Sequence, residues 1–129
     1  MMDFGDAAWA SMSPAMWMAR FEAAQVHRTI FAREMVITSG RRPATPGGSS
    51  RHETGNAMDI RVREPDRTWA MSGQQQVEFA RILTIRLGPD YDVIVEGPAA
   101  TIPRYRDRVP HIHVEYDPKG RHLTEQVED

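Results

Sequence analysis

The spacing of apolar residues predicts two amphipathic helices. Ser13-Pro14 is a typical helix start, with serine as the N-cap and proline in the first turn. A stripe with helical spacing then runs to about residue 33 and comprises Ala19, Ala23, Val26 and Ile30, with Phe21 and Ala24 beside it. A second helix is expected behind the capping-box pattern Ser72-Gly-Gln-Gln75 and should stop at Gly88-Pro89.

Alternating and β-branched runs predict four short strands, at residues 34–38, 57–62, 91–95 and 111–116. In the second of these, apolar residues alternate with Asp59 and Arg61, which is typical of a half-buried strand. In the last, they alternate with His111, His113 and Glu115. Loops rich in glycine, proline or charge separate the strands at 40–50 and 97–110.

These elements predict an α+β fold, in which the helices pack on one side of a small antiparallel sheet of about four strands. The length of 129 residues fits one domain over residues 1–129. Residues 1–12 are expected to be an irregular lead-in and residues 118–129 a polar tail.

Composition excludes several kinds of partner and metal site. The formal net charge of -2 argues against nucleic acid or anionic membrane as a partner, because both need a basic surface. The chain has no cysteine, so disulfides and thiolate metal sites are excluded. The first residues lack a basic region, so we expect no secretory signal peptide, and no run has the length of a membrane span.

Histidine and carboxylate remain as metal ligands, and three of them form a pattern. If the strands at 57–62 and 111–116 are neighbours, Asp59 and His113 can project from the same surface. His52 lies seven residues before Asp59 and can fold back over that surface, with Gly55 allowing a close approach. Two imidazoles and one carboxylate are a recurring catalytic set for one Zn²⁺ that leaves a position for water, although manganese and iron fit the same donors.

The segment Ser50-x-His52-x-x-Gly55-x-Ala57-x-Asp59 resembles the S-x-H-x-x-G-x-A-x-D motif of the D-Ala-D-Ala metallopeptidases. That family shares its fold and zinc site with lysostaphin-type endopeptidases and the hedgehog signalling domain. The segment His111-Ile-His113 resembles the H-x-H of the same group, and Ser39-Gly-Arg-Arg42-Pro is similar to its S-G-Y-R segment. The resemblance implies a hedgehog-like fold and zinc held by His52, Asp59 and His113.

The resemblance also implies roles for neighbouring residues. Arg42 would bind a substrate carboxylate, and Ser50 would hydrogen-bond the substrate or hold its loop. Several members place a glutamate three residues before the last ligand, where this chain has Pro110. His111 is therefore expected to assist proton transfer, and Glu96 is the second candidate for this role. A glutamate at a strand end is more commonly a surface charge.

The function expected from the resemblance is a zinc peptidase, either a carboxypeptidase or an endopeptidase, that hydrolyses stem or cross-link peptides of bacterial peptidoglycan. Short members without a signal peptide resemble phage endolysins or virion-associated proteins. Such proteins act on the cell wall after lysis or from the phage particle, where phage structural proteins would be their partners. Two alternatives stay open. One is a non-catalytic structural component that retains the fold, and the other is a metal-free scaffold that binds a partner through loop 97–110.

Overall fold

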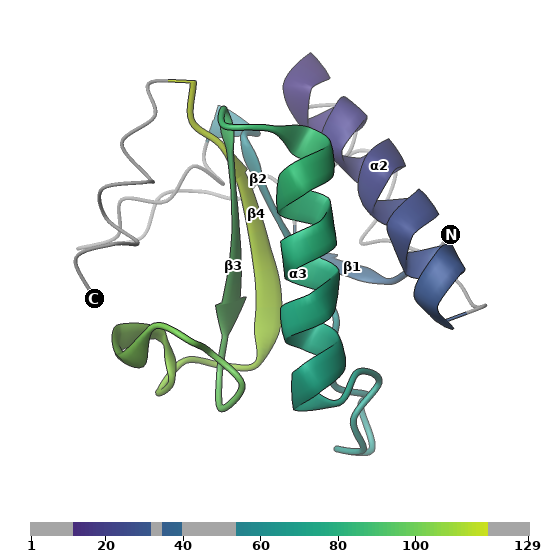
Figure 1. The fold of residues 1–129 in the computed structure, drawn as a ribbon, viewed down its shortest axis with the longest axis vertical. Coiled ribbons are helices and arrows are strands. Elements are labelled where there is room, and N and C mark those ends of the chain that lie inside the picture. The colour runs from purple at the N-terminus through teal and green to yellow at the C-terminus, as the bar shows by residue number, and fades with distance from the viewer. Residues whose placement is uncertain (1–11, 32–34, 40–53, 119–129) are drawn as a thin grey trace.

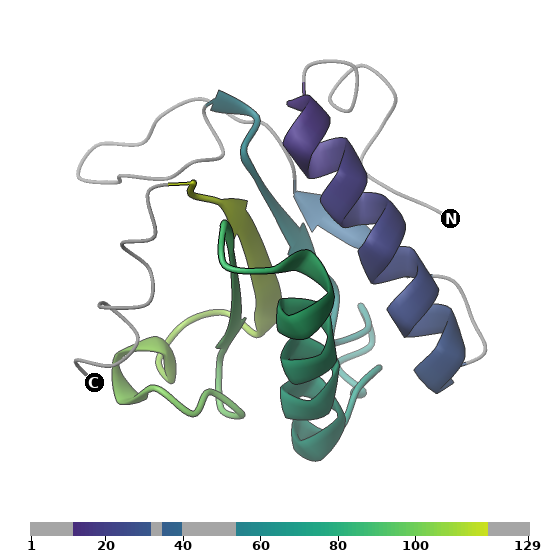
Figure 2. The same cartoon turned by 45° about the horizontal axis from the view of Figure 1, so that its top comes forward.

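The computed structural model describes residues 12–31, 35–39 and 54–118. It shows the predicted α+β fold, with a four-stranded antiparallel sheet and two helices on one of its faces (Figure 1, Figure 2). Neither described helix combines the length and the apolar character needed to cross a bilayer. The expected lead-in up to residue 11, the tail from residue 119 and the whole of loop 40–50 lie outside the described residues, as do Arg42, Ser50 and His52.

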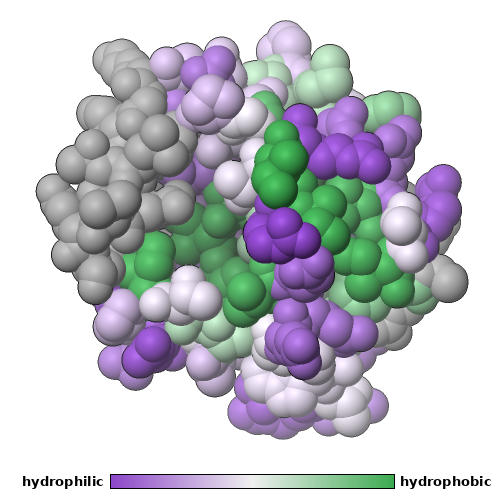
Figure 3. Space-filling model, viewed as in Figure 1, coloured by the Kyte–Doolittle hydropathy of each residue, from purple (hydrophilic) through white to green (hydrophobic). Residues whose placement is uncertain are grey.

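Helix α2 (Pro14–Phe31) begins where the sequence predicts, and the Ser13 hydroxyl accepts a hydrogen bond from the Met16 backbone N–H at 3.2 Å. Its predicted stripe is buried, with Ile30 partly so. Phe21, which was expected beside the stripe, is 59% exposed and lies on the outer side of the helix. Apolar atoms are visible in Figure 3 where α2 and α3 lie side by side.

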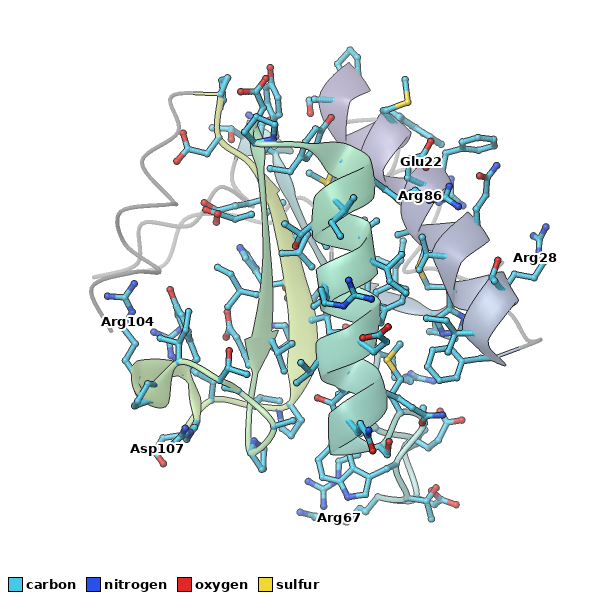
Figure 4. The ribbon with its side chains drawn as sticks, viewed as in Figure 1. Glu22, Arg28, Arg67, Arg86, Arg104 and Asp107 are labelled. Atoms are coloured by element: carbon cyan, nitrogen blue, oxygen red, sulfur yellow. The ribbon has the colours of Figure 1, made fainter. Side chains whose placement is uncertain are left out.

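Helix α3 (Gly73–Leu87) has the predicted capping box. The Gln75 N–H donates to the Ser72 hydroxyl at 3.1 Å, and the Ser72 N–H donates to the Gln75 side-chain oxygen at 2.8 Å. An ion pair of 3.1 Å between Arg86 and Glu22 joins α3 to α2 at the surface (Figure 4). His27 is buried between the helices, with its ring 4.7 Å from that of Phe31 and 5.9 Å from that of Phe79, so its role is in packing.

The sheet has the order β1-β2-β4-β3, and all neighbours are antiparallel. Its strands are β1 (Ile37–Ser39), β2 (Ala57–Ile60), β3 (Tyr91–Glu96) and β4 (His111–Tyr116). Strand β2 ends two residues earlier than predicted, because the chain from Val62 to Ala70 turns into a small hairpin of its own. All four residues of β2 are buried, whereas the alternation predicted a half-buried strand.

One face of the sheet packs against the helices and forms the core. The two central strands contribute Met58, Ile60, Ile112 and Val114 to this face, and the edge strands add Ile37, Val93 and Val95. Helix α3 adds Phe79 and Leu83 to the same cluster. Since side chains alternate across a strand, the residues between these apolar positions point to the opposite face.

Gly97, directly after β3, fixes the approach to β4. Its φ of 106° disfavours any other residue, and a Cβ atom there would lie 2.8 Å from the Pro110 Cα. Gly88 offers a matched control, since its φ is 87° but a Cβ would meet no atom within 4 Å.

We predict that Gly88→Ala lowers the free energy of unfolding by about 1–2 kcal/mol through backbone strain alone. Gly97→Ala should cost measurably more, because the added methyl also displaces Pro110. Urea unfolding of both variants tests this difference. Equal costs would mean that the contact with Pro110 relaxes freely and does not hold the start of β4.

Candidate metal centre

Asp59, His111 and His113 form a group that could hold a metal ion. The pairing of β2 with β4 sets Asp59 directly opposite His113, and His111 lies two residues earlier on the same face. One ligand atom from each residue lies within 4.8 Å of the others. The Asp59 Oδ1 atom is the common neighbour, 3.1 Å from His113 Nδ1 and 3.4 Å from His111 Nε2.

Both imidazoles are oriented by a hydrogen bond on the ring nitrogen that faces away from Asp59. His111 Nδ1 lies 2.7 Å from the Val109 carbonyl oxygen, and His113 Nε2 lies 2.8 Å from Glu115 Oε1. Because these oxygens only accept, each of the two nitrogens carries a proton and donates it. The other nitrogen of each ring then faces Asp59, an arrangement that recurs around metal-binding histidines.

The donor set and its spacing fit zinc. Ligands at zinc–ligand distances of about 2.0–2.2 Å around a tetrahedral ion are separated by roughly 3.3–3.5 Å. The distances of 3.1 and 3.4 Å from Asp59 Oδ1 to the two ring nitrogens are close to that separation. Manganese and iron accept the same donors, so the ligand types alone do not choose among the three metals.

His113 lies between two carboxylates, and its protonation follows from that position. Burial lowers the pKa of its imidazole, but the hydrogen bonds and charges of Asp59 and Glu115 outweigh burial and raise the pKa to about 9. The metal-free site therefore holds a His113 imidazolium at neutral pH. A metal bound at Nδ1 would replace one of its protons.

Glu96 is part of the same site. Its Oε1 lies 3.4 Å from His111 Nε2 and 3.5 Å from an Arg108 Nη1, and the residue is only 6% exposed. The expectation that a glutamate at this strand end is a surface charge is therefore wrong. The pairing of Glu96 with His111 across β3 and β4 explains its burial.

The structure thus brings Asp59, His113 and His111 together, with Glu96 and Glu115 beside the two histidines. Glu115 touches His113 directly and is not a detached surface charge. Asp92 and Asp117 also offer oxygens within 4.8 Å of Glu115. Sequence spacing did not indicate this acidic group, because it depends on the pairing of β3 with β4.

A cleft of about 820 Å³ opens beside the metal-binding group and reaches Asp59, Glu96 and His111. The hairpin after β2 and the segment before β4 form its other walls. The cleft thus lies between residues within 63–72 and residues within 97–110. Neither segment has a sequence pattern that predicts their meeting at one cleft.

We predict that metal uptake competes with the His113 proton. Because the pKa of His113 is raised to about 9, the imidazole is charged below that pH and must lose a proton to bind. Apparent zinc affinity should therefore rise about tenfold per pH unit between pH 6 and 8. In the metal-free protein, the stability that charged His113 contributes is complete below about pH 6.5 and is lost as the pH rises through about 9.

Isothermal titration calorimetry at pH 7 in buffers of different ionisation enthalpy measures the released proton. Glu115→Gln removes one of the two carboxylates on His113 and should weaken zinc binding about 10- to 100-fold. A binding enthalpy that is the same in every buffer would contradict the proposed exchange of proton for metal.

No family model matches the chain, and the comparison with curated proteins gives no match. The resemblance to the D-Ala-D-Ala metallopeptidases therefore stands on its motif residues alone. Of these, Asp59, His111 and His113 have the geometry described above, and His52 lies outside the described residues.

Proposed function

We propose that this protein is a zinc-dependent peptidase that hydrolyses peptide bonds in the stem or cross-link peptides of bacterial peptidoglycan. The observation that carries this proposal is the pair of oriented histidines, each with one ring nitrogen held by an oxygen and the other facing Asp59 Oδ1. The open cleft next to this group gives a peptide access to it. The substrate class comes from the motif resemblance.

Asp59 and His113 would hold the ion, together with either His52, as the resemblance implies, or His111. Zinc at such a site lowers the pKa of a bound water and polarises a carbonyl oxygen. If His52 is the third ligand, His111 is free to take a proton at Nε2, since its Nδ1 is held by the Val109 carbonyl. If His111 is the third ligand, the buried Glu96 carboxylate beside it would take the proton instead.

A protein of this kind would reach the cell wall after lysis or from a phage particle. This location rests on analogy with phage-encoded members of the resembling family. Both a free endolysin and a component of a virion fit it.

A non-catalytic structural component is the second candidate, and one observation favours it. The position where several members carry a catalytic glutamate is Pro110, which lines the cleft and has no side-chain group that can accept a proton. The metal-binding group could then serve stability alone.

We expect the zinc-loaded protein to release new amino termini from purified peptidoglycan. Asp59→Asn should reduce this activity at least about a hundredfold, because a neutral amide, a much weaker metal ligand, replaces the carboxylate next to both ring nitrogens. Asp107→Asn is the matched control, since Asp107 is exposed on the loop between β3 and β4 (Figure 4), and should keep full activity.

Zinc-loaded wild-type protein that is folded but releases neither amino termini nor D-alanine from several peptidoglycan types would contradict the peptidase proposal. A melting temperature that still falls on chelation would then favour the structural component.

A further inference from the structure

Four arginines line the cleft. Arg61, Arg63 and Arg67 come from the segment after β2, and Arg108 comes from the segment before β4. Figure 4 shows Arg67 at the end of the molecule where α3 begins. The cleft thus has several cationic side chains in its lining next to the metal-binding group, although the chain as a whole is slightly acidic.

The four arginines differ in whether a nearby carboxylate balances their positive charge. Arg61 lies 3.6 Å from Glu64, and Arg108 lies 3.5 Å from Glu96. Arg63 and Arg67 form no ion pair with a carboxylate in the part of the chain that the structure describes. Their charges are available to a ligand in the cleft.

Arg63 is also held in place. Its Nε donates a hydrogen bond to the Arg67 carbonyl oxygen at 3.3 Å, and its guanidinium carbon lies 4.8 Å from the centre of the Trp69 ring. The hairpin bridge between Arg63 and Trp69 fixes both residues. These contacts use Nε and one face of the guanidinium group, so the two terminal nitrogens remain for a bidentate contact at a reduced entropic cost.

The geometry points to a carboxylate subsite, anchored by Arg63, in the cleft of the proposed peptidase. This inference rests on the proposed function and narrows its substrate to a peptide that carries a free carboxylate away from the bond at the metal centre. A planar carboxylate suits a guanidinium fork. A polyanion suits the cleft less well, because Glu64 and Glu96 line the same walls. The subsite is separate from Arg42, the carboxylate-binding residue that the resemblance implies.

Trp69 allows binding to be measured without catalysis, since its indole lies against Arg63. The probe is a pair of synthetic pentapeptides, L-Ala-D-Glu-L-Lys-D-Ala-D-Ala with free carboxylates and the same peptide with only the D-Glu carboxylate amidated. The C-terminal carboxylate that Arg42 would bind is present in both peptides. Each is mixed with zinc-loaded protein in a stopped-flow instrument, and the dissociation constant is taken from tryptophan fluorescence before turnover.

The acid peptide should bind the wild type about tenfold more tightly than the amide, as expected for a charge-assisted hydrogen bond. Arg63→Gln should remove this preference and leave binding of the amide unchanged. Arg63→Lys should restore only part of it, because it keeps the charge without the fork. Arg81→Gln is the control, since Arg81 is exposed on α3 and paired with Glu78 at 2.8 Å.

Equal affinity of the wild type for both peptides would overturn the subsite, and so would an unchanged preference in Arg63→Gln. The wild-type comparison needs no variant, so it decides the matter even if Arg63→Gln fails to fold. Discrimination without cleavage would support the subsite while the peptidase proposal fails. Cleavage without discrimination would keep the peptidase and overturn the subsite.

Discussion

The register of β2 against β4 is the constraint on which the site depends. It sets Asp59 opposite His113, and the alternation of side chains brings His111 to the same face. A slip of β2 by one residue would turn Asp59 toward the helices and Met58 and Ile60 away from them. The buried apolar face therefore fixes the polar face, because the same register serves both.

The polar face of the sheet holds buried negative charges that need positive partners. Asp59, Asp92 and Glu96 are each no more than 6% exposed, and burying a carboxylate without a partner is costly. His113 supplies one positive charge in the metal-free protein, held by Asp59 on one side and Glu115 on the other. A divalent ion beside Asp59 would take over that role, which is why we regard the metal centre and the stability of this face as linked.

Local sequence rules account for much of the fold. The capping box of Ser72 and Gln75 predicted the start of α3, and alternation in 111–116 gave the bounds of β4. The burial of Glu96 and the stacking of Arg63 on Trp69 were not predictable, since they arise from strand pairing and from a hairpin whose residues show no periodic pattern. Asp59 and His113 were predicted as neighbours because they lie on regular strands, where the direction of a side chain follows from its position.

The most direct test of the metal centre is a crystal structure of the zinc-loaded protein with anomalous diffraction at the zinc edge. We predict one strong peak within about 2.3 Å of both Asp59 Oδ1 and His113 Nδ1, with a third protein ligand from His111 or His52. A zinc peak elsewhere on the surface, or no peak in fully loaded crystals, would contradict the account.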